Sequence, residues 1–328
     1  MKAAMLVEPG RIEINEVREP EVGADDVRIA VIGVGLCGSD LSVFHGKWKA
    51  PEYPWIQGHE AFGTIEAVGE RVAATRLGET VVLEPNVACG SCDQCRRGWT
   101  SACPKRQSVG MNRPGAMAEK VVVPSSNAWT VRPRAATDLV CAEPLTVVEA
   151  ALRRLPTPVP EAALVIGVGA QGLLMCVALQ RRGVRVHTFD VNEDRVAFAA
   201  TLGAIPLAER DSGDRFDLIV DSSGNPEAVA LAVERAEIGG TIVELGLESR
   251  PFELSAQTIV RRQLVLRGSL TYDHPGDFRS TVALLDEDLV APGQVVTDEY
   301  AFEDAHRAFG QWATARGKTW IRIRPDPA

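Results

Sequence analysis

Four cysteines are crowded into fifteen residues of this chain, at Cys89, Cys92, Cys95 and Cys103. Gaps of two residues let neighbouring thiolates turn onto one metal ion, and the longer gap brings the chain back to the fourth corner of a tetrahedron. With all four corners taken by sulfur, no position is left open for a substrate. The spacing therefore predicts a structural zinc site in this four-cysteine lobe, residues 89–103. The alternative is a set of free or redox-active cysteines.

A second set of candidate metal ligands is spread along the chain. Cys37 stands in GLCGSD, His59 and Glu60 stand in QGHEAFG, and Glu143 stands in CAEPL. A catalytic zinc takes three protein ligands and keeps one position for water or substrate, and a thiolate, an imidazole and a carboxylate suit it. Each motif alone is more often plain structure. Their weight comes from sharing a chain with the four-cysteine lobe and with a dinucleotide motif.

That motif is a glycine-rich turn that follows the apolar run AALVI and opens an apolar helix. It contains Gly167, Gly169, Ala170, Gln171 and Gly172. The first glycine permits the tight turn, the second lets a pyrophosphate approach the backbone, and the third lets the helix pack on the strand. The phosphates then lie at the positive end of the helix. The alternative is that the glycines serve helix packing alone.

An acidic residue, Asp190, ends the run VRVHTFD about 20 positions further on. Such a residue holds the ribose hydroxyls of NAD, and its charge repels the 2′-phosphate of NADP, so we expect NAD. Arg195 is a candidate for a phosphate contact, but it lies one helical turn into the next element. Ser222, in the SSGN that follows FDLIVD, and Gly246, in GLES, fall at the carboxyl edge of the expected sheet and complete the cofactor candidates.

Two patterns of apolar runs divide the chain. The first 130 residues contain short apolar or alternating runs, at 2–7, 26–35, 63–70, 79–85 and 119–124, and read as β-rich. From residue 162, apolar runs at 162–167, 184–189, 216–221, 241–246 and 263–268 alternate with helical stretches such as 193–203 and 226–236. This alternation predicts a parallel, doubly wound sheet, hence an α/β protein. A helix at 303–315 and a strand at 319–324 follow.

The chain length and net charge fit a protein of two domains without a nucleic-acid or membrane partner. The chain has 328 residues and a formal net charge of −9, which argues against nucleic acid and anionic membranes. The apolar stretch 162–179 is broken by the glycines of the turn, so we read it as a strand, a turn and a helix and not as a membrane span. No signal peptide opens the chain, and a tight cysteine cluster suggests metal in a reducing compartment, the cytoplasm.

Taken together, GHEAFGTIEAVGERV, the four-cysteine lobe and VIGVGAQG resemble the zinc-dependent medium-chain dehydrogenases in content and order. VVLEPN and AEPLTVVEAALRR are most similar to the branch with sorbitol and threonine dehydrogenases. Residues around CGSDLS also resemble aminocyclitol enzymes such as 2-deoxy-scyllo-inosamine dehydrogenase. The resemblance implies a GroES-like β-rich catalytic domain at 1–145 and 285–328, and a Rossmann domain at 146–284. It also implies a homodimer or homotetramer paired through the Rossmann sheet edge.

The resemblance also assigns roles to the scattered residues. It implies that Cys37, His59 and one glutamate hold a catalytic zinc, with Glu60 the usual direct ligand of the branch. Glu143 matches a glutamate that binds directly or through water, and Cys141 is read as a buried small hydrophobe. Ser39 matches the residue that takes the alcohol proton.

One departure from the family pattern affects the path of that proton. Many relatives carry a histidine where this chain has Ser42. Either His45 then relays the proton or water carries it, and a surface position for His45 favours water.

The function implied is the transfer of hydride between a secondary alcohol of a small polyol, sugar or cyclitol and NAD, with one catalytic and one structural zinc ion per chain. A threonine-type amino-alcohol dehydrogenase or a carbonyl reductase would share every motif. A protein of another class, which binds zinc and NAD without significant turnover, is the further alternative. Loss of Cys37, Ser39 or His59 would have favoured that alternative, and all three are present.

Overall fold

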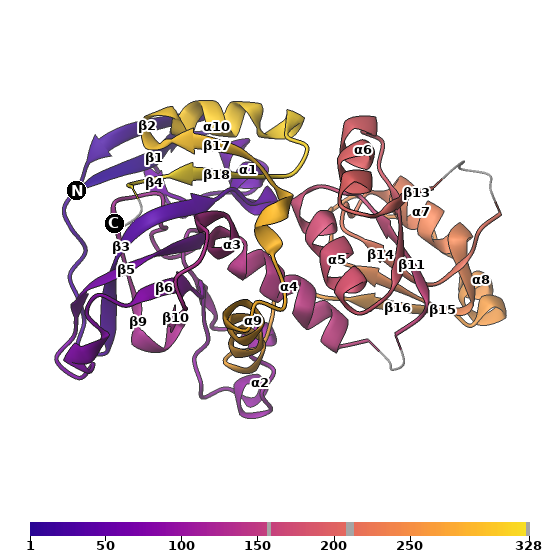
Figure 1. The fold of residues 1–328 in the computed structure, drawn as a ribbon, viewed down its shortest axis with the longest axis horizontal. Coiled ribbons are helices and arrows are strands. Elements are labelled where there is room, and N and C mark those ends of the chain that lie inside the picture. Colours follow the sequence, from indigo (N-terminus) through magenta and orange to yellow (C-terminus); the bar gives the residue numbers. More distant parts are fainter. Residues whose placement is uncertain (156–158, 208–212, 326–328) are drawn as a thin grey trace. The chain divides into compact units, whose positions relative to one another are not determined.

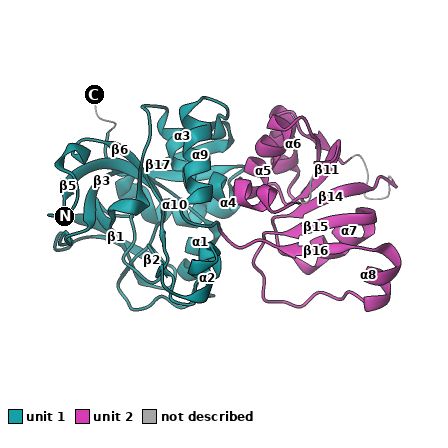
Figure 2. Ribbon diagram, turned by 90° about the horizontal axis from the view of Figure 1, so that it is seen from below, with its two compact units in different colours: residues 1–146, 272–328 teal, residues 147–271 magenta. Residues whose placement is uncertain are grey.

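The computed structural model describes residues 1–155, 159–207 and 213–325 of the chain. It divides into two compact units, residues 1–146 with the segment that begins at Tyr272, and residues Val147–Thr271 (Figure 2). Each unit is built around its own sheet, mostly antiparallel in the first and parallel in the second.

The first unit contains a large sheet in which β10, β6, β5, β3, β18 and β17 follow one another, with β9 also paired to β3 (Figure 1). A smaller sheet has the order β2-β1-β4, and β7 pairs with β8. The strands are β1 (Lys2–Glu8), β2 (Arg11–Glu16), β3 (Asp26–Gly35), β4 (Trp55–Ile56), β5 (Glu60–Val68), β6 (Thr80–Leu83), β7 (Asn86–Val87), β8 (Gln107–Ser108), β9 (Lys120–Pro124), β10 (Ala128–Thr130), β17 (Val296–Ala301) and β18 (Lys318–Arg322).

Strand β3 organises this sheet because it pairs with β5, β9 and β18. Its last seven residues are all buried, so it reads as a continuous apolar run and not as an alternating one. Gly35, the last residue of β3, pairs with Glu60, the first residue of β5, and also with Trp320 of β18. The register therefore brings the segment after β3 next to the start of β5, two segments that carry candidate ligands.

Helices close the first unit around its core. They are α1 (Gly38–Phe44), α2 (Asp93–Arg96), α3 (Ala136–Val140), α9 (Gly276–Asp286) and α10 (Ala305–Gln311), while α4 (Ala142–Arg153) begins in this unit and runs into the second. The expected helix at 303–315 is divided, because a short 3-10 turn, Trp312–Thr314, follows α10.

The second unit is the doubly wound α/β unit that the sequence predicts. Its strands follow the order β13-β12-β11-β14-β15-β16 and all pair in parallel, which is the strand order of a dinucleotide-binding fold. They are β11 (Ala162–Ile166), β12 (Arg185–Phe189), β13 (Ile205–Pro206), β14 (Phe216–Asp221), β15 (Ala236–Glu244) and β16 (Val265–Gly268). The helices are α5 (Ala170–Arg181), α6 (Glu193–Thr201), α7 (Pro226–Arg235) and α8 (Ala256–Arg262).

The boundary between the units differs from the expected one at its second position. The sequence places residues 272–284 in the Rossmann domain, but they belong to the first unit. The reason is α9, because Phe278 stacks on Trp129 with ring centroids 5.8 Å apart, and Arg132 N donates to Asp286 Oδ1. The sequence is rich in proline at 155–161, which is typical of a domain junction, and residues 156–158 of this segment lie outside the described residues.

The apolar stretch 162–179 forms β11, the glycine turn and most of α5. Among the described residues, no helix has the length and apolar character needed to cross a membrane.

Candidate metal centres and cofactor site

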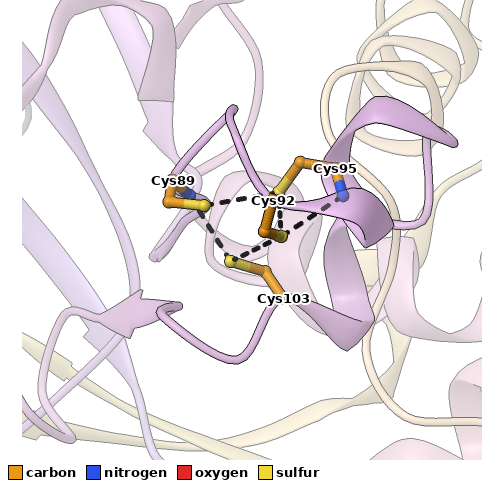
Figure 3. Close-up of side chains that lie close together, drawn as sticks. All are labelled: Cys89, Cys92, Cys95 and Cys103. Atoms are coloured by element: carbon orange, nitrogen blue, oxygen red, sulfur yellow. Dashed lines mark hydrogen bonds between the residues drawn. The ribbon is translucent and has the colours of Figure 1, made fainter.

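The four cysteines of the lobe converge, as Figure 3 shows. The Sγ atoms of Cys92 and Cys95 lie 3.4 Å apart, and those of the pairs Cys89–Cys95 and Cys92–Cys103 lie 3.9 Å apart. Four thiolates about 2.3 Å from one zinc ion at tetrahedral angles lie about 3.8 Å from each other. The spacing is therefore that of a four-thiolate metal site, and it is too long for a disulfide.

Backbone amides already favour thiolate in part of this lobe. Hydrogen bonds from the backbone of Ser91 and Cys92 lower the pKa of Cys89 to about 6. Burial and the neighbouring sulfurs raise the pKa of Cys95 to about 12. Four negative charges at this spacing repel one another unless a cation lies between them, so the donor set fits a divalent ion.

The second ligand set is assembled by the pairing of β3 with β5. Cys37 follows the end of β3, and His59 and Glu60 stand at the start of β5. One ligand atom from each of these three residues lies within 4.8 Å of the others, and His59 and Glu60 are buried. The structure thus brings together three of the four candidate ligands predicted for the catalytic centre.

Asp40 ties the two ligand segments to each other. Its carboxylate accepts hydrogen bonds from Cys37 N at 3.1 Å and from Gly58 N at 3.2 Å, and it lies 3.5 Å from His59 Nδ1. Its side chain has no exposed surface. A carboxylate against one ring nitrogen of a histidine fixes the orientation of the ring and directs the other nitrogen toward a metal ion.

The charges around His59 favour a cation. Burial by itself lowers the pKa of His59, but Asp40 and Cys37 together raise it well above its ordinary value. The surroundings therefore stabilise a positive charge at this position, whether on the imidazole or on a metal ion held by it. A thiol, an imidazole and a carboxylate in such a field fit a zinc ion.

Lys318, the first residue of β18, is buried beside Glu60. Its ammonium donates to Leu36 O at 3.0 Å and to Glu60 Oε2, and both side chains are almost fully buried. Burial lowers the pKa of Lys318, but Glu60 and Cys37 raise it above its ordinary value, so the lysine stays charged. Lys318 therefore fixes one oxygen of Glu60 and balances its charge.

Glu143 lies in the first turn of α4, buried near the three clustered ligands but outside the set within 4.8 Å. Burial, together with the charge of Glu60, raises the pKa of Glu143 to about 7, although His59 opposes the change. Tyr272 is buried beside Glu143, and its neighbour His274 places Nδ1 2.9 Å from Glu84 Oε2. Tyr272 and His274 both belong to the first unit.

The candidate proton-transfer residues all lie on α1 or at its end. Ser39 is half-buried, two residues after Cys37. Ser42 Oγ donates to Gly38 O at 3.1 Å, so it bonds within its own helix. His45 is exposed at the C-terminal end of the helix, with its ring edge-on to Phe44 at 5.1 Å. The exposed position of His45 agrees with the interpretation of a surface histidine.

The glycine turn of the second unit has the geometry that its sequence predicts. Gly167 has φ +80°, which favours glycine, and Gly169 caps the N-terminus of α5. A Cβ on Gly172 would lie 1.9 Å from Gly167 O, so only glycine lets α5 approach β11 this closely. Ala170 and Gln171 lie in the first turn of α5, where free backbone N–H groups of a helix can bind an anion.

Asp190 lies against this turn at the end of β12. Its carboxylate accepts hydrogen bonds from Val168 N at 2.8 Å and from Asn192 N at 2.9 Å. Arg195 on α6 reaches the same turn, since a Cβ on Gly169 would lie 4.0 Å from its Nη1. The structure thus brings Asp190 and Arg195 to the glycine turn, with the arginine closer than its place in the sequence suggests.

Two loops at the carboxyl edge of the parallel sheet meet next to the glycine turn. Ser222 Oγ donates to Gly167 O, and a Cβ on Gly167 would lie 3.1 Å from Ser222 Oγ. A Cβ on Gly246 would lie 2.0 Å from Gly224 N, so these two loops are in backbone contact. Ser222 and Gly246 are therefore on the edge of the sheet where the sequence expects a cofactor.

Sequence reasoning missed Asp40 and Lys318. Asp40 had a usable signal, a carboxylate three residues after a candidate ligand on the first turn of a helix, within the quoted motif GLCGSD. Lys318 had none, because a single lysine before an apolar strand is usually a solvated residue, and only the pairing of β18 with β3 takes it inside.

Two family models match the chain. "Alcohol dehydrogenase GroES-like domain" matches residues 23–133, and "Zinc-binding dehydrogenase" matches residues 170–287. The starvation-sensing protein RspB of Escherichia coli K12 is 31% identical over 92% of this chain and 93% of its own length. D-altritol 5-dehydrogenase of Agrobacterium fabrum is 33% identical over 82% of this chain and 84% of its own length. L-threonine 3-dehydrogenase of Streptomyces avermitilis is 31% identical over 94% of this chain and 95% of its own length.

Solved structures agree over nearly the whole chain. The rspB alcohol dehydrogenase of Escherichia coli CFT073, solved with NADH, superposes with a TM-score of 0.90 at 28% identity, over 98% of this chain and 99% of that one. Galactitol-1-phosphate dehydrogenase of Escherichia coli gives a TM-score of 0.90 at 27% identity, over 98% of this chain and 100% of that one. The resemblance seen in the sequence is confirmed, and the chain belongs to the zinc-binding, medium-chain alcohol dehydrogenase family of oxidoreductases.

Proposed function

We propose that this protein uses NAD to oxidise a secondary hydroxyl of a small polyol, sugar or cyclitol at a zinc centre held by Cys37, His59 and Glu60. The observation that carries the proposal is the convergence of these three side chains, two of them buried, with ligand atoms within 4.8 Å of one another. Glu143 lies beside them and binds the ion directly or through water. The lobe of four cysteines holds a second, structural zinc ion.

When bound, zinc polarises the substrate hydroxyl as a Lewis acid and NAD accepts the hydride. Asp40 keeps the His59 ring in one orientation, and Lys318 holds one oxygen of Glu60, so that the ligands are preorganised. Ser39 accepts the alcohol proton and passes it on, since a hydroxyl can relay a proton but not store it. Water takes the proton from Ser39, because His45 is exposed at the end of α1.

The relatives support a polyol more directly than a monoalcohol. D-Altritol 5-dehydrogenase and galactitol-1-phosphate dehydrogenase are named for polyol substrates. Several relatives at about the same identity are L-threonine 3-dehydrogenases, which supports an amino alcohol as the second candidate substrate class. An NAD-reduction screen over polyols, sugars, cyclitols and amino alcohols tests the proposal. Turnover confined to L-threonine would favour the second candidate, and no turnover with zinc and NAD bound would favour a binding protein.

The proposed cofactor is NAD, since Asp190 presents a carboxylate at the glycine turn where a 2′-phosphate would be repelled. We expect wild-type protein to prefer NAD over NADP by several-fold to hundreds-fold, about 1–3 kcal/mol for a lost charged contact. Asp190→Ser should weaken the binding of NAD and reduce the preference for NAD over NADP. Asp194→Ser, on the exposed start of α6, serves as the matched control. Steady-state KM values for both cofactors measure it, and a wild-type preference for NADP would contradict the role of Asp190.

We further propose a homodimer or homotetramer in the cytoplasm. The outer strand β16 of the parallel sheet exposes Val265, and Val260 of α8 is 72% exposed. An exposed apolar edge strand is a ready surface for pairing with a second copy. All seven cysteines are free thiols, which fits a reducing compartment. Light scattering at several concentrations tests the assembly, and a monomer at micromolar concentration would contradict it.

A further inference from the structure

Two carboxyl groups face each other at the carboxyl edge of the parallel sheet in the second unit. Asp221 is the last residue of β14 and Glu244 is the last residue of β15, and the two are partners in the strand register. Asp221 has no exposed surface. The Oε1 atom of Glu244 is buried, and no described residue donates a hydrogen bond to it. The two side chains hydrogen-bond to each other, which requires a proton on one of the two carboxyl groups.

The hydrogen bonds around the pair show which carboxyl is ionised. Asp221 Oδ1 accepts from Ser223 N at 2.8 Å and from Ser223 Oγ at 2.7 Å, and Asp221 Oδ2 accepts from Gly224 N at 3.2 Å. Three donors favour the carboxylate form of Asp221. The proton therefore lies on Glu244, which faces Asp221 and can donate to it.

The same pair connects two loops. The carboxylate of Asp221 holds residues 222–224, while its backbone carbonyl accepts from Leu245 N at 2.8 Å and from Gly246 N at 3.3 Å. The loops touch, because a Cβ on Gly246 would meet Gly224 N at 2.0 Å. Ser222 then reaches the glycine turn at Gly167. A movement of the Asp221 and Glu244 side chains would therefore also move both loops and the glycine turn.

We propose that Asp221 and Glu244 share one proton, and that this proton holds loops 222–225 and 245–249 in the arrangement that binds the dinucleotide. The inference rests on the proposed NAD site. Loss of the proton to solvent would place two carboxylates against each other, and their repulsion would separate the strand ends. Glu244 and Asp221 are positioning residues in this scheme, because they act through the loops.

Burial and the charge of Asp221 raise the pKa of Glu244 to about 8, and burial also raises the pKa of Asp221. The native state therefore keeps a proton that the unfolded chain, with an ordinary glutamate, loses near pH 4.5. The contribution of Glu244 to stability is complete below that pH and declines as pH rises through about 8. We expect the affinity for the cofactor to fall as Glu244 loses its proton near pH 8.

Charged residues on the packed elements bond elsewhere or lie on other faces. Arg262 donates to Val233 O and Ala236 O, Arg235 to Asp214 O at 3.4 Å, and Arg267 to Arg154 O at 2.6 Å. Strand β11 carries no charged residue. The remaining charged groups on α7, α8 and the loop after β15 are Glu227, Glu234, Arg261, Glu248, Arg250 and Glu253. Asp221 is the charged residue that perturbs Glu244.

The test is the dissociation constant of NADH between pH 7 and 9, measured by fluorescence with wild type, Glu244→Gln and the exposed control Glu253→Gln. Glutamine keeps a donor toward Asp221 without titrating. We expect the wild-type and control constants to rise about tenfold over this range, as for one linked proton on a group with a pKa of about 8. The Glu244→Gln constant should stay within about twofold of its value at pH 7, while equal rises in all three proteins would overturn the proposal.

Hydrogen exchange on wild-type protein without cofactor gives a second readout that needs no variant. Relative to the amides of β11, those of 222–225 and 245–249 should lose protection as pH rises through about 8. Constant relative protection would overturn the shared proton even if Glu244→Gln failed to fold. If NADH does not bind at pH 7, the proposed cofactor site fails and the positioning role with it, while exchange still decides whether the proton is shared.

Discussion

The two candidate metal centres of this protein are built in opposite ways. In the lobe, four thiols come from one stretch, residues 89–103, and three of the four are half-exposed. In the Cys37–His59–Glu60 centre, the ligands come from separate segments at the ends of paired strands, and two of the three are buried. The lobe holds four like ligands, whereas the buried centre mixes sulfur, nitrogen and oxygen beside a lysine and two further carboxylates.

The difference predicts that one centre stabilises a loop and that the other performs catalysis. A closed set of four thiolates has no position for substrate, so its metal can contribute only to folding. A mixed set of three leaves a position open, and its surroundings of Asp40, Lys318 and Glu143 set charge and orientation. Changes in the buried centre should therefore affect turnover, while changes in the lobe should affect stability.

The largest effect on turnover is expected from His59→Ala. Loss of a ligand removes the Lewis acid, which contributes several kcal/mol, so kcat/KM should fall by about 10³-fold or more. The thermal midpoint and NADH affinity should change little. The exposed His306 on α10 offers a matched control, His306→Ala, which should keep wild-type activity. Comparable turnover in His59→Ala and His306→Ala would contradict the catalytic role of the buried centre.

The proton path should give the next largest effect. Ser39→Ala removes the group that takes the alcohol proton and should lower kcat by about 10²–10⁴-fold. His45→Ala should cost little, because His45 is exposed at the end of α1, and Ser42→His should speed oxidation at neutral pH by supplying an imidazole. Initial rates from pH 6 to 9 check all three. Near-normal activity in Ser39→Ala, or a drop of about 10²-fold in His45→Ala, would overturn the path through water.

The smallest effect on turnover per folded molecule is expected from Cys92→Ser, which opens the lobe. A structural site contributes folding free energy, so the variant should unfold at lower temperature and be more sensitive to chelators. Cys176→Ser, which changes a buried cysteine of α5 in the second unit, controls for the loss of a thiol. A turnover loss in Cys92→Ser as large as in His59→Ala, at equal folded fraction, would erase the distinction between the centres.

The lobe and the glycine turn could be predicted from sequence because their geometry is local. Spacing places Cys89, Cys92 and Cys95 around one point, and the Gly167–Gly172 contact follows from the turn itself. The parallel strands were also predictable, because each is a short apolar run between helical stretches. All five expected Rossmann strands are present: β14 has the expected bounds, and the other four have shifted ends.

The buried centre could not be derived from local pattern. Cys37, His59 and Glu143 are far apart in sequence, and their grouping depended on family resemblance. Lys318 reaches Glu60 only through the register of β18 on β3, and the Asp221–Glu244 pair depends on the register of β14 on β15. Long-range strand pairing is set by the whole core, so a residue on one strand gives no sign of its partner. The place of α9 in the first unit has the same origin, its packing on Trp129.

Metal analysis of purified wild type, His59→Ala and Cys92→Ser tests the central claim of two separable zinc centres most directly. We expect two zinc ions per chain in the wild type. His59→Ala should retain one ion and its thermal stability but lose turnover, and Cys92→Ser should retain one ion and turnover but lose stability. One zinc ion or none in carefully prepared wild type, or the same loss of metal, stability and turnover in both variants, would contradict the account.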